Sequence, residues 1–342
     1  MTNSALRTSH SALNSPWPHR VAVLLVCATF PLIWVGGLVT TYDAGMAVPD
    51  WPSTYGYNLF LYPWQTWLFG PFDLFIEHGH RLLGAVVGLI AIALAAVVFR
   101  CDKRNWVRGL AVATLTAVIF QGLLGGLRVI GNDVQLAKIH GIFGPMFFGL
   151  CVAMAIVTSR LWREAANVAP DAQGGKLQRL AIITAGLALL QIAVGAHLRH
   201  LPVDFSPAMF RGVVFFHLIL AAALVVHVVL LAVRVLRKHR RQPALVRPAL
   251  ALVGLIVLQL ALGSGTWVVN YAWPSWMQGF EFTSNLTLQA GGFWQAIVVT
   301  GHQALGSLIL AFTVVLTLRS LRLLPANAAT VSPNVKLTGV HA

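Results

Sequence analysis

The sequence predicts an all-α integral membrane protein whose eight transmembrane helices form two four-helix bundles, arranged as parallel repeats. Two observations on composition support this fold class: 57% of the 342 residues are hydrophobic, and only 10% are charged. Soluble domains carry roughly 25% charged residues. A third observation is that the apolar residues gather in runs of about 20, the length that a helix needs to cross a bilayer. A soluble globular protein is therefore excluded.

Eight apolar runs are long enough to span a membrane, and we expect each to form one helix. They cover residues 21–40, 82–99, 109–127, 139–159, 179–197, 212–234, 248–268 and 295–318. The runs define an N-terminal tail (1–20), a first half (21–160), a linker (161–178), a second half (179–320) and a C-terminal tail (321–342). We expect the first half to hold a substrate and the second half to hold a cofactor, for the reasons given below.

The charged residues predict which way the chain faces. The net charge of +14 lies between the apolar runs, whereas a nucleic-acid-binding protein would gather it on a polar face. If the N-terminus is cytoplasmic, 19 of the 24 Lys and Arg residues face the cytoplasm. The positive-inside rule then places both termini in the cytoplasm. Five cations remain on the outer side: Arg81, Arg128, Lys138, Arg199 and Arg211.

An internal repeat relates the two halves. The third, fifth and seventh runs share a Gln-x-x-x-Gly motif near their ends, which begins at Gln121, Gln191 and Gln259. The even-numbered runs instead begin near a histidine, and the spacing from His80 to Gln121 nearly equals that from His217 to Gln259. With four helices per copy, the second copy enters the membrane in the same direction as the first, which makes the repeat parallel.

Four histidines, one on each even-numbered run, lie at one depth near the outer surface: His80, His140, His217 and His302. A single membrane histidine is often a packing residue, but four at equivalent positions need compensating partners, because each carries a desolvation cost. Zinc and copper sites recruit thiolates or carboxylates at short spacing, which Cys27, Cys101 and Cys151 do not provide. Histidines on facing helices can instead bind a haem iron from both sides. The five outer cations are then candidates to bind haem propionates.

One other haem arrangement is disfavoured. Two haems stacked across the membrane would need a second, deeper histidine on each ligating helix, and His227 is the only such residue. It follows His217 by ten residues and so faces about 80° away on a helix. We therefore expect His227 to be structural.

The two halves differ in acidity near the histidines. Glu77 precedes His80 by three residues, whereas Val299 stands at the corresponding place before His302. An acid beside a haem can exchange protons, although Glu77 could instead be an exposed helix N-cap. This difference favours a reaction site in the first half and an electron-transfer site in the second. A non-catalytic cytochrome b and a parallel-repeat transporter are the alternatives.

The motifs EHGHRLLG and DAGMAVPDWP, with KIHG and HQALG at the starts of two even-numbered runs, resemble the haem A synthase family over about residues 21–320. The resemblance implies oxidation of the C8 methyl group of haem O to a formyl group, which yields haem A for terminal oxidases. It further implies Glu77 as the catalytic acid. His80, His140, Arg81 and Arg128 would contact the substrate haem, while His217 and His302 would be axial ligands of a haem b cofactor.

The resemblance also implies that the chain lies in the bacterial inner membrane or, in a eukaryote, the mitochondrial inner membrane. From their positions near outer helix ends, Lys138, Arg199 and Arg211 are further propionate candidates. We expect a haem O synthase and a membrane electron acceptor as partners, and the sequence leaves open whether copies of the chain associate. Many bacterial members carry a cysteine pair in an outer loop, whereas the outer segments 41–79 and 269–294 contain no cysteine. Disulfide or thiol chemistry is therefore not expected.

Overall fold

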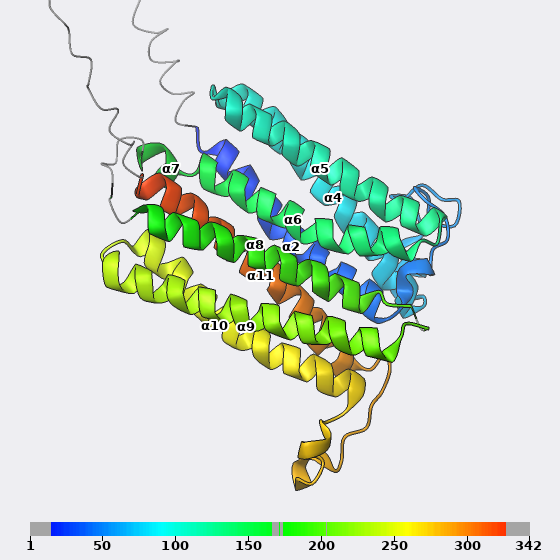
Figure 1. Cartoon of the computed structure of the whole chain (residues 1–342). Helices are drawn as coiled ribbons and strands as arrows, with labels where there is room; N and C mark the ends of the chain where they lie inside the picture. The colour runs from blue at the N-terminus through cyan, green and yellow to red at the C-terminus, as the bar shows by residue number, and fades with distance from the viewer. Residues whose placement is uncertain (1–14, 166–170, 172–173, 203, 326–342) are drawn as a thin grey trace, which may run out of the picture.

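The computed structural model describes residues 15–165, 171, 174–202 and 204–325, and it is built from α-helices. Eight of the described helices are long and apolar enough to cross a membrane (Figure 1). They are α2 (Trp17–Thr41), α4 (Phe72–Cys101), α5 (Asn105–Ile130), α6 (Val134–Thr158), α8 (Gly174–Arg199), α9 (Pro207–Lys238), α10 (Pro243–Tyr271) and α11 (Phe293–Leu323). The predicted all-α membrane fold with eight spans is confirmed.

The helices extend beyond the apolar runs, and the largest extension is at the start of α4. This helix begins at Phe72, ten residues before the run that starts at residue 82, because its first turns carry polar side chains that an apolar window rejects. Asp73 lies in the first turn, where a negative charge favours the helix dipole. Glu77 and His80 are consequently the sixth and ninth residues of a continuous helix, so Glu77 is not its N-cap.

Each half of the chain has its own hydrophobic core. In the first half α2 packs against α4 and α6, and α5 closes the ring between α4 and α6. The second half repeats this arrangement with α8, α9, α10 and α11. One cluster of buried apolar residues, which includes Leu25, Leu94 and Met154, fills the first ring, and another, which includes Leu231 and Leu252, fills the second. The two clusters support the predicted division into two repeats, which stays a prediction together with its boundaries.

The two halves meet along α2, α6, α8 and α11. Figure 1 shows α4 and α5 along one edge of the molecule and α9 and α10 along the opposite edge, with the other four helices between them. A separate apolar cluster formed by Ile33, Phe148, Val152 and Ala311 lies at this interface. It joins the first half to α11 of the second.

The long loops and the chain ends lie at opposite ends of the bundle. Residues 42–71, which contain η1 (Ala44–Met46) and α3 (Trp64–Phe69), and residues 272–292, which contain η3 (Ser275–Met277) and η4 (Glu281–Thr283), lie at one end (Figure 1). The start of α2 and the end of α11 lie at the other end. Most of the two predicted tails and the middle of the predicted linker lie outside the described residues.

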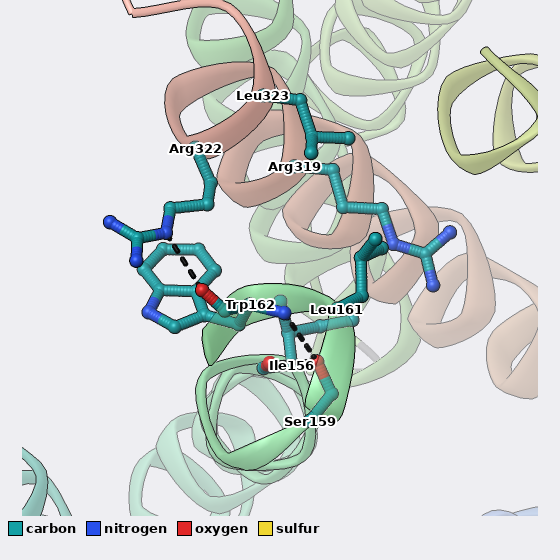
Figure 2. A pocket seen from close by; sticks show the side chains of 7 residues that line it. All are labelled: Ile156, Ser159, Leu161, Trp162, Arg319, Arg322 and Leu323. Carbon is teal, nitrogen blue, oxygen red and sulfur yellow. Dashed lines mark hydrogen bonds between the residues drawn. The ribbon is translucent and has the colours of Figure 1, made fainter. Parts of the chain in front are cut away.

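At the end opposite the long loops, α7 (Arg160–Glu164) ties the first half to α11 (Figure 2). The Nε of Arg322 donates a 2.8 Å hydrogen bond to the carbonyl oxygen of Trp162, and its guanidinium lies 5.3 Å from the centroid of the Trp162 ring. Arg319 lines a cavity of about 10 Å³ beside them. That volume has room for one water molecule, so the cavity is a packing gap between the halves.

Candidate functional site: two histidine pairs

The four predicted histidines form two pairs of similar geometry near the long loops. The ring centroids of His80 (α4) and His140 (α6) lie 6.4 Å apart, with an interplanar angle of 83°. Those of His217 (α9) and His302 (α11) lie 6.5 Å apart, at 62°. Each pair therefore joins two helices of one half. All four residues are the seventh to eleventh of their helices, which is two to three turns from the helix start.

A glycine of the preceding membrane helix supports each histidine ring. A Cβ atom built on these glycines would meet the Cε1 atom of the facing ring at 2.8 to 3.4 Å. The contacts pair Gly36 with His80 at 2.8 Å, Gly125 with His140 at 3.0 Å, Gly195 with His217 at 3.4 Å and Gly263 with His302 at 3.0 Å. Three of these glycines belong to the repeated Gln-x-x-x-Gly motif. The motif therefore makes room for an imidazole, a role that the sequence repeat did not reveal.

The glutamine of the same motif holds the helix that carries the histidine. The side-chain amide of Gln121 donates a 2.8 Å hydrogen bond to the carbonyl oxygen of His140. Gln191 and Gln259 donate in the same way to the carbonyl oxygens of His217 and His302, each at 3.1 Å. The fourth position of the pattern, four residues before Gly36, is Leu32, so the backbone of His80 receives no such bond. The His80 site is thus the exception among four related positions.

The ring nitrogens are suited to bind a metal ion. His140 directs Nδ1 at the carbonyl oxygen of Gln121, 3.2 Å away, and a donating Nδ1–H leaves the lone pair on Nε2. The side-chain amide of Gln191 lies 3.1 Å from Nε2 of His217 and donates to its lone pair, so a metal ion bound at this nitrogen would displace that hydrogen bond. Among the described residues, the buried Nδ1 atoms of His80, His217 and His302 have no hydrogen-bond partner. Each of these three imidazoles therefore keeps a nitrogen that a bound group could use.

The number of protein ligands favours a haem over a bare metal ion. Within the part of the chain that the structure describes, no group of three or more His, Cys, Asp or Glu side chains could hold a metal ion. A structural zinc site needs four protein ligands, and a catalytic zinc site needs three. Two imidazoles on opposite sides of one iron are sufficient when a porphyrin supplies the equatorial nitrogens. The residues present therefore fit a haem in each half.

Glu77 is buried beside the first pair and is fixed by two donors. Its side chain is 2% exposed. Its carboxylate accepts a 2.8 Å hydrogen bond from the backbone N–H of Val48 and a 2.8 Å hydrogen bond from Arg81. Glu77 precedes His80 by three residues on α4, so the two side chains lie on neighbouring positions of one helix face. The carboxylate is thus held close to the first histidine pair.

Arg81 also fastens the loop of residues 42–71 over this site. Its guanidinium donates to the carbonyl oxygens of Val48, Asp50 and Ser53 at 2.7 to 2.9 Å, in addition to Glu77. Three of the hydrogen bonds of Arg81 therefore connect α4 to the loop, and the fourth holds Glu77 on the same helix. The predicted contact of Arg81 with a haem propionate stays a prediction, and the structure gives the residue a second role that the sequence did not suggest.

The Pro-Asp-Trp-Pro motif of the loop shapes this cover. The carboxylate of Asp50 accepts hydrogen bonds from the N–H groups of Tyr55 and Gly56 and from the Ser53 hydroxyl. Partial burial acts to raise the pKa of Asp50, but these hydrogen bonds outweigh it and hold the pKa below its ordinary value of 3.8. Trp51 packs on Gly126 of α5, where an added Cβ would lie 2.3 Å from the indole ring.

His78 is a site residue that sequence reasoning missed. It is 2% exposed, and its Nδ1 lies 3.0 Å from the hydroxyl of Thr54. Its ring lies 5.1 Å from that of Tyr62 and 5.5 Å from that of Trp67, centroid to centroid. It therefore holds the loop on the side of α4 that faces away from His80. The neighbouring histidine in the sequence EHGH was the available signal.

The other predicted propionate ligands are placed differently. The guanidinium of Arg128 packs on Gly45 beneath the loop, so it lies close to the first pair. Arg199 bridges the halves, because it donates to Thr41, to the carbonyl oxygen of Gly37 at 2.8 Å and to the amide oxygen of Gln303. Lys138 donates to Gln135 at 3.0 Å and Arg211 is exposed. These remaining four propionate assignments stay predictions as well.

Known proteins resemble this chain across the region that carries the first pair. The sequence model of the COX15-CtaA family, described as cytochrome oxidase assembly protein, matches residues 19–210, which is more than half of the chain. The chain belongs to this family.

Two curated relatives are named heme A synthase. The one from Shouchella clausii is 28% identical over 187 residues, which cover 53% of this chain and 58% of that protein. The one from Halalkalibacterium halodurans is 27% identical over 251 residues, which cover 67% of this chain and 79% of that protein. The first match thus spans less than two thirds of the relative's length.

Proposed function

We propose that this protein is a haem A synthase, which oxidises the C8 methyl group of haem O to a formyl group. The observation that carries the proposal is the contrast between two histidine pairs of similar geometry, of which the first has a buried carboxylate one turn away. A purely electron-carrying protein needs two haem sites but no acid beside one of them. The family membership and the names of the relatives support the same function.

His217 and His302 would hold a resident haem b, which when bound would supply reversible one-electron chemistry between the substrate site and an acceptor. Gly195 and Gly263 set the positions of these two imidazoles, and Gln191 and Gln259 anchor the helices that carry them. The removal of four electrons from a methyl group requires an acceptor in the membrane. A haem O synthase that delivers the substrate is the second proposed partner.

His80 and His140 would bind the iron of the substrate haem. Two successive hydroxylations, each of which would take its oxygen atom from a water molecule and give up two protons and two electrons, followed by the loss of one water from the geminal diol, would convert the methyl group to the formyl group. The carboxylate of Glu77 would accept protons released near this carbon, and the electrons would pass to the membrane acceptor. Arg81 and the Val48 N–H hold this carboxylate in place. The loop of residues 42–71 covers Glu77 and shields its carboxylate from bulk water, which strengthens the electrostatic interactions there.

In the proposed orientation the protein lies in the cytoplasmic membrane with both chain termini in the cytoplasm. The long loops are then on the outer side, and both histidine pairs lie near the outer surface of the membrane. Nineteen of 24 cations then face the cytoplasm. Reporter fusions after residues 104 and 240 should read cytoplasmic, and a fusion near residue 60 should read external. An external signal at residue 240 would overturn the orientation.

Extraction of haem from cells that express this chain together with a haem O source tests the function. A formyl-bearing haem, absent from cells with the empty vector, is the expected result. The rival function, a non-catalytic cytochrome b, predicts stable haem in both halves and no new haem. Recovery of unaltered haem O beside a correctly folded, haem-loaded protein would refute the synthase assignment.

A further inference from the structure

A groove runs between α4 and α5 in the first half of the molecule. It has a volume of about 280 Å³, and its walls are apolar. The lining residues are Gly84, Gly88, Ile92, Leu115, Val118 and Ile119. A Cβ atom built on either glycine would meet no atom within 4 Å, so the absence of two side chains is what leaves the space open.

The groove lies along α4, on the cytoplasmic side of the first histidine pair in the proposed orientation. Gly84 and Gly88 follow His80 by one and two helical turns, and the face of α4 that carries them winds gradually from the core toward the surface. Ile92 and Ile119 at the far end are 54% and 55% exposed. From Gly84 to Ile92 the helix rises about 12 Å at 1.5 Å per residue. The groove thus offers an apolar surface that starts one helical turn beyond His80 and opens at the exposed side of α4 and α5.

The second half has no counterpart in sequence for the two open positions. When His217 is aligned with His80, the residues that correspond to Gly84 and Gly88 are Ala221 and Val225. Val225 packs against the hydrophobic core of the second half. The two halves therefore share the histidine pair but differ at these two positions, and the two open glycines belong to the half that contains Glu77.

We propose that this groove binds the long prenyl tail of the haem substrate, an inference that rests on the proposed function. Haem b has a short vinyl group where haem O carries a hydroxyalkyl prenyl chain, so a groove at two glycines that have no counterparts in the second half matches the difference between the two haems. Because lipid is as apolar as the groove, the gain comes from packing and orientation and not from hydrophobic burial. A seated tail fixes the rotation of the macrocycle, and with it which methyl group faces Glu77.

The test is to transplant the residues of the second half into the first, as the double variant Gly84→Ala/Gly88→Val. Purified protein that carries its resident haem is titrated with haem O and, separately, with haem b, and binding to the first half is followed by difference absorption. We expect the wild type to prefer haem O and the double variant to bind haem O roughly tenfold more weakly or worse, since overpacking of a well-fitted site has that effect. Haem b binding should not change.

The matched control is Gly254→Val, which adds the same β-branched side chain to an exposed glycine of α10 with no atom within 4 Å. It should keep the preference of the wild type. A double variant that still prefers haem O, or that weakens both haems equally, would overturn the proposal. So would unchanged haem titrations together with the loss of a co-purified phospholipid, which would make the groove a lipid acyl-chain site.

The outcome is separable from that of the proposed function. If the wild type makes a formyl-bearing haem but its preference for haem O does not depend on Gly84 and Gly88, the tail site is wrong and the synthase assignment stands. If the wild type makes none and the double variant still loses the preference for haem O, the tail site stands and the synthase assignment is wrong.

Discussion

The two halves of this protein share the arrangement of their four helices and differ in the residues beside the histidine pair. Both arrange four helices in the same ring and place a histidine pair at the same level, with glycines behind the rings. On α4 the positions three before and one after the histidine are Glu77 and Arg81, whereas α9 has Val214 and Leu218 there. The acid and the arginine beside the histidine therefore occur on α4 and have no counterparts on α9.

The segments that connect the first two membrane helices of each half also differ. The segment between α2 and α4 is long and is pinned over the first pair by Glu77, Arg81 and Asp50. Its counterpart between α8 and α9 is only a few residues long. A covered, acid-containing site suits a reaction that must be shielded from bulk water, whereas an electron carrier needs neither feature. Four changes to the chain test this contrast, in order of decreasing effect.

The largest effect is expected from His217→Ala or His302→Ala. Either change removes one of two axial ligands, so the low-spin spectrum of a bis-histidine haem b should disappear from the purified protein. His80→Ala should keep that spectrum, because the substrate half does not hold the resident haem. His227→Gln, a change of another histidine on α9, is the control. An unchanged bis-histidine signal in both the His217→Ala and the His302→Ala variant would refute the assignment of these residues as haem b ligands.

Glu77→Gln should act on turnover and not on the resident haem. Because the amide keeps the size of the side chain but accepts no proton, we expect product formation to fall by about 100-fold or more, the usual range for general acid–base groups. Asp73→Asn, an exposed carboxylate in the first turn of the same helix, should leave turnover unchanged. Normal turnover by Glu77→Gln would refute the catalytic role, and joint loss of haem b would point to a structural one.

Glycine-to-alanine changes behind the rings should give graded, smaller effects. Overpacking costs about 1–3 kcal/mol, and a cost of about 1.4 kcal/mol corresponds to roughly tenfold weaker haem binding. In the second half, Gly263→Ala places a Cβ 3.0 Å from His302 and should weaken the resident haem, whereas Gly195→Ala, at 3.4 Å from His217, should be nearly silent. Gly36→Ala should reduce turnover and spare the resident haem. Equal effects of Gly263→Ala, Gly195→Ala and Gly36→Ala on the spectrum of the resident haem would contradict two separate haem sites.

The smallest effect concerns the loop of residues 42–71 at low pH. The pKa of Asp50 is lowered in the folded protein, so its hydrogen bonds stabilise the loop above pH 3.8 and are lost as the pH falls through the lower, folded value. Limited proteolysis of this loop should therefore accelerate below pH 3.8. The loop of the Asp50→Asn variant should be cleaved faster at neutral pH, and its cleavage rate should not rise further below pH 3.8. A wild-type cleavage rate that is independent of pH would exclude the role of Asp50.

The residue pattern alone determined the membrane fold and the identity of the four histidines. Apolar runs of helix length specify spans because a bilayer leaves no other way to satisfy the backbone, and repeated motifs reveal equivalent helices without any knowledge of packing. The apolar runs did not predict the start of α4, because its first turns carry polar residues. One of these, Glu77, is paired with the backbone of Val48 in the loop, far away in the sequence. Glu77 was recognised as the distinguishing acid from its spacing to His80.

Only the tertiary structure decided how these residues are used. Arg81 and Arg199 are arginines near outer helix ends in the sequence, and both were predicted to bind propionates. In the folded protein Arg81 binds three loop carbonyl groups, and Arg199 joins α2 to α11. Likewise the groove beside Gly84 and Gly88 depends on how closely α5 approaches α4. Partners that lie far away in the sequence, or a space that no residue fills, leave no local pattern to read, because they arise from how helices pack and not from periodicity.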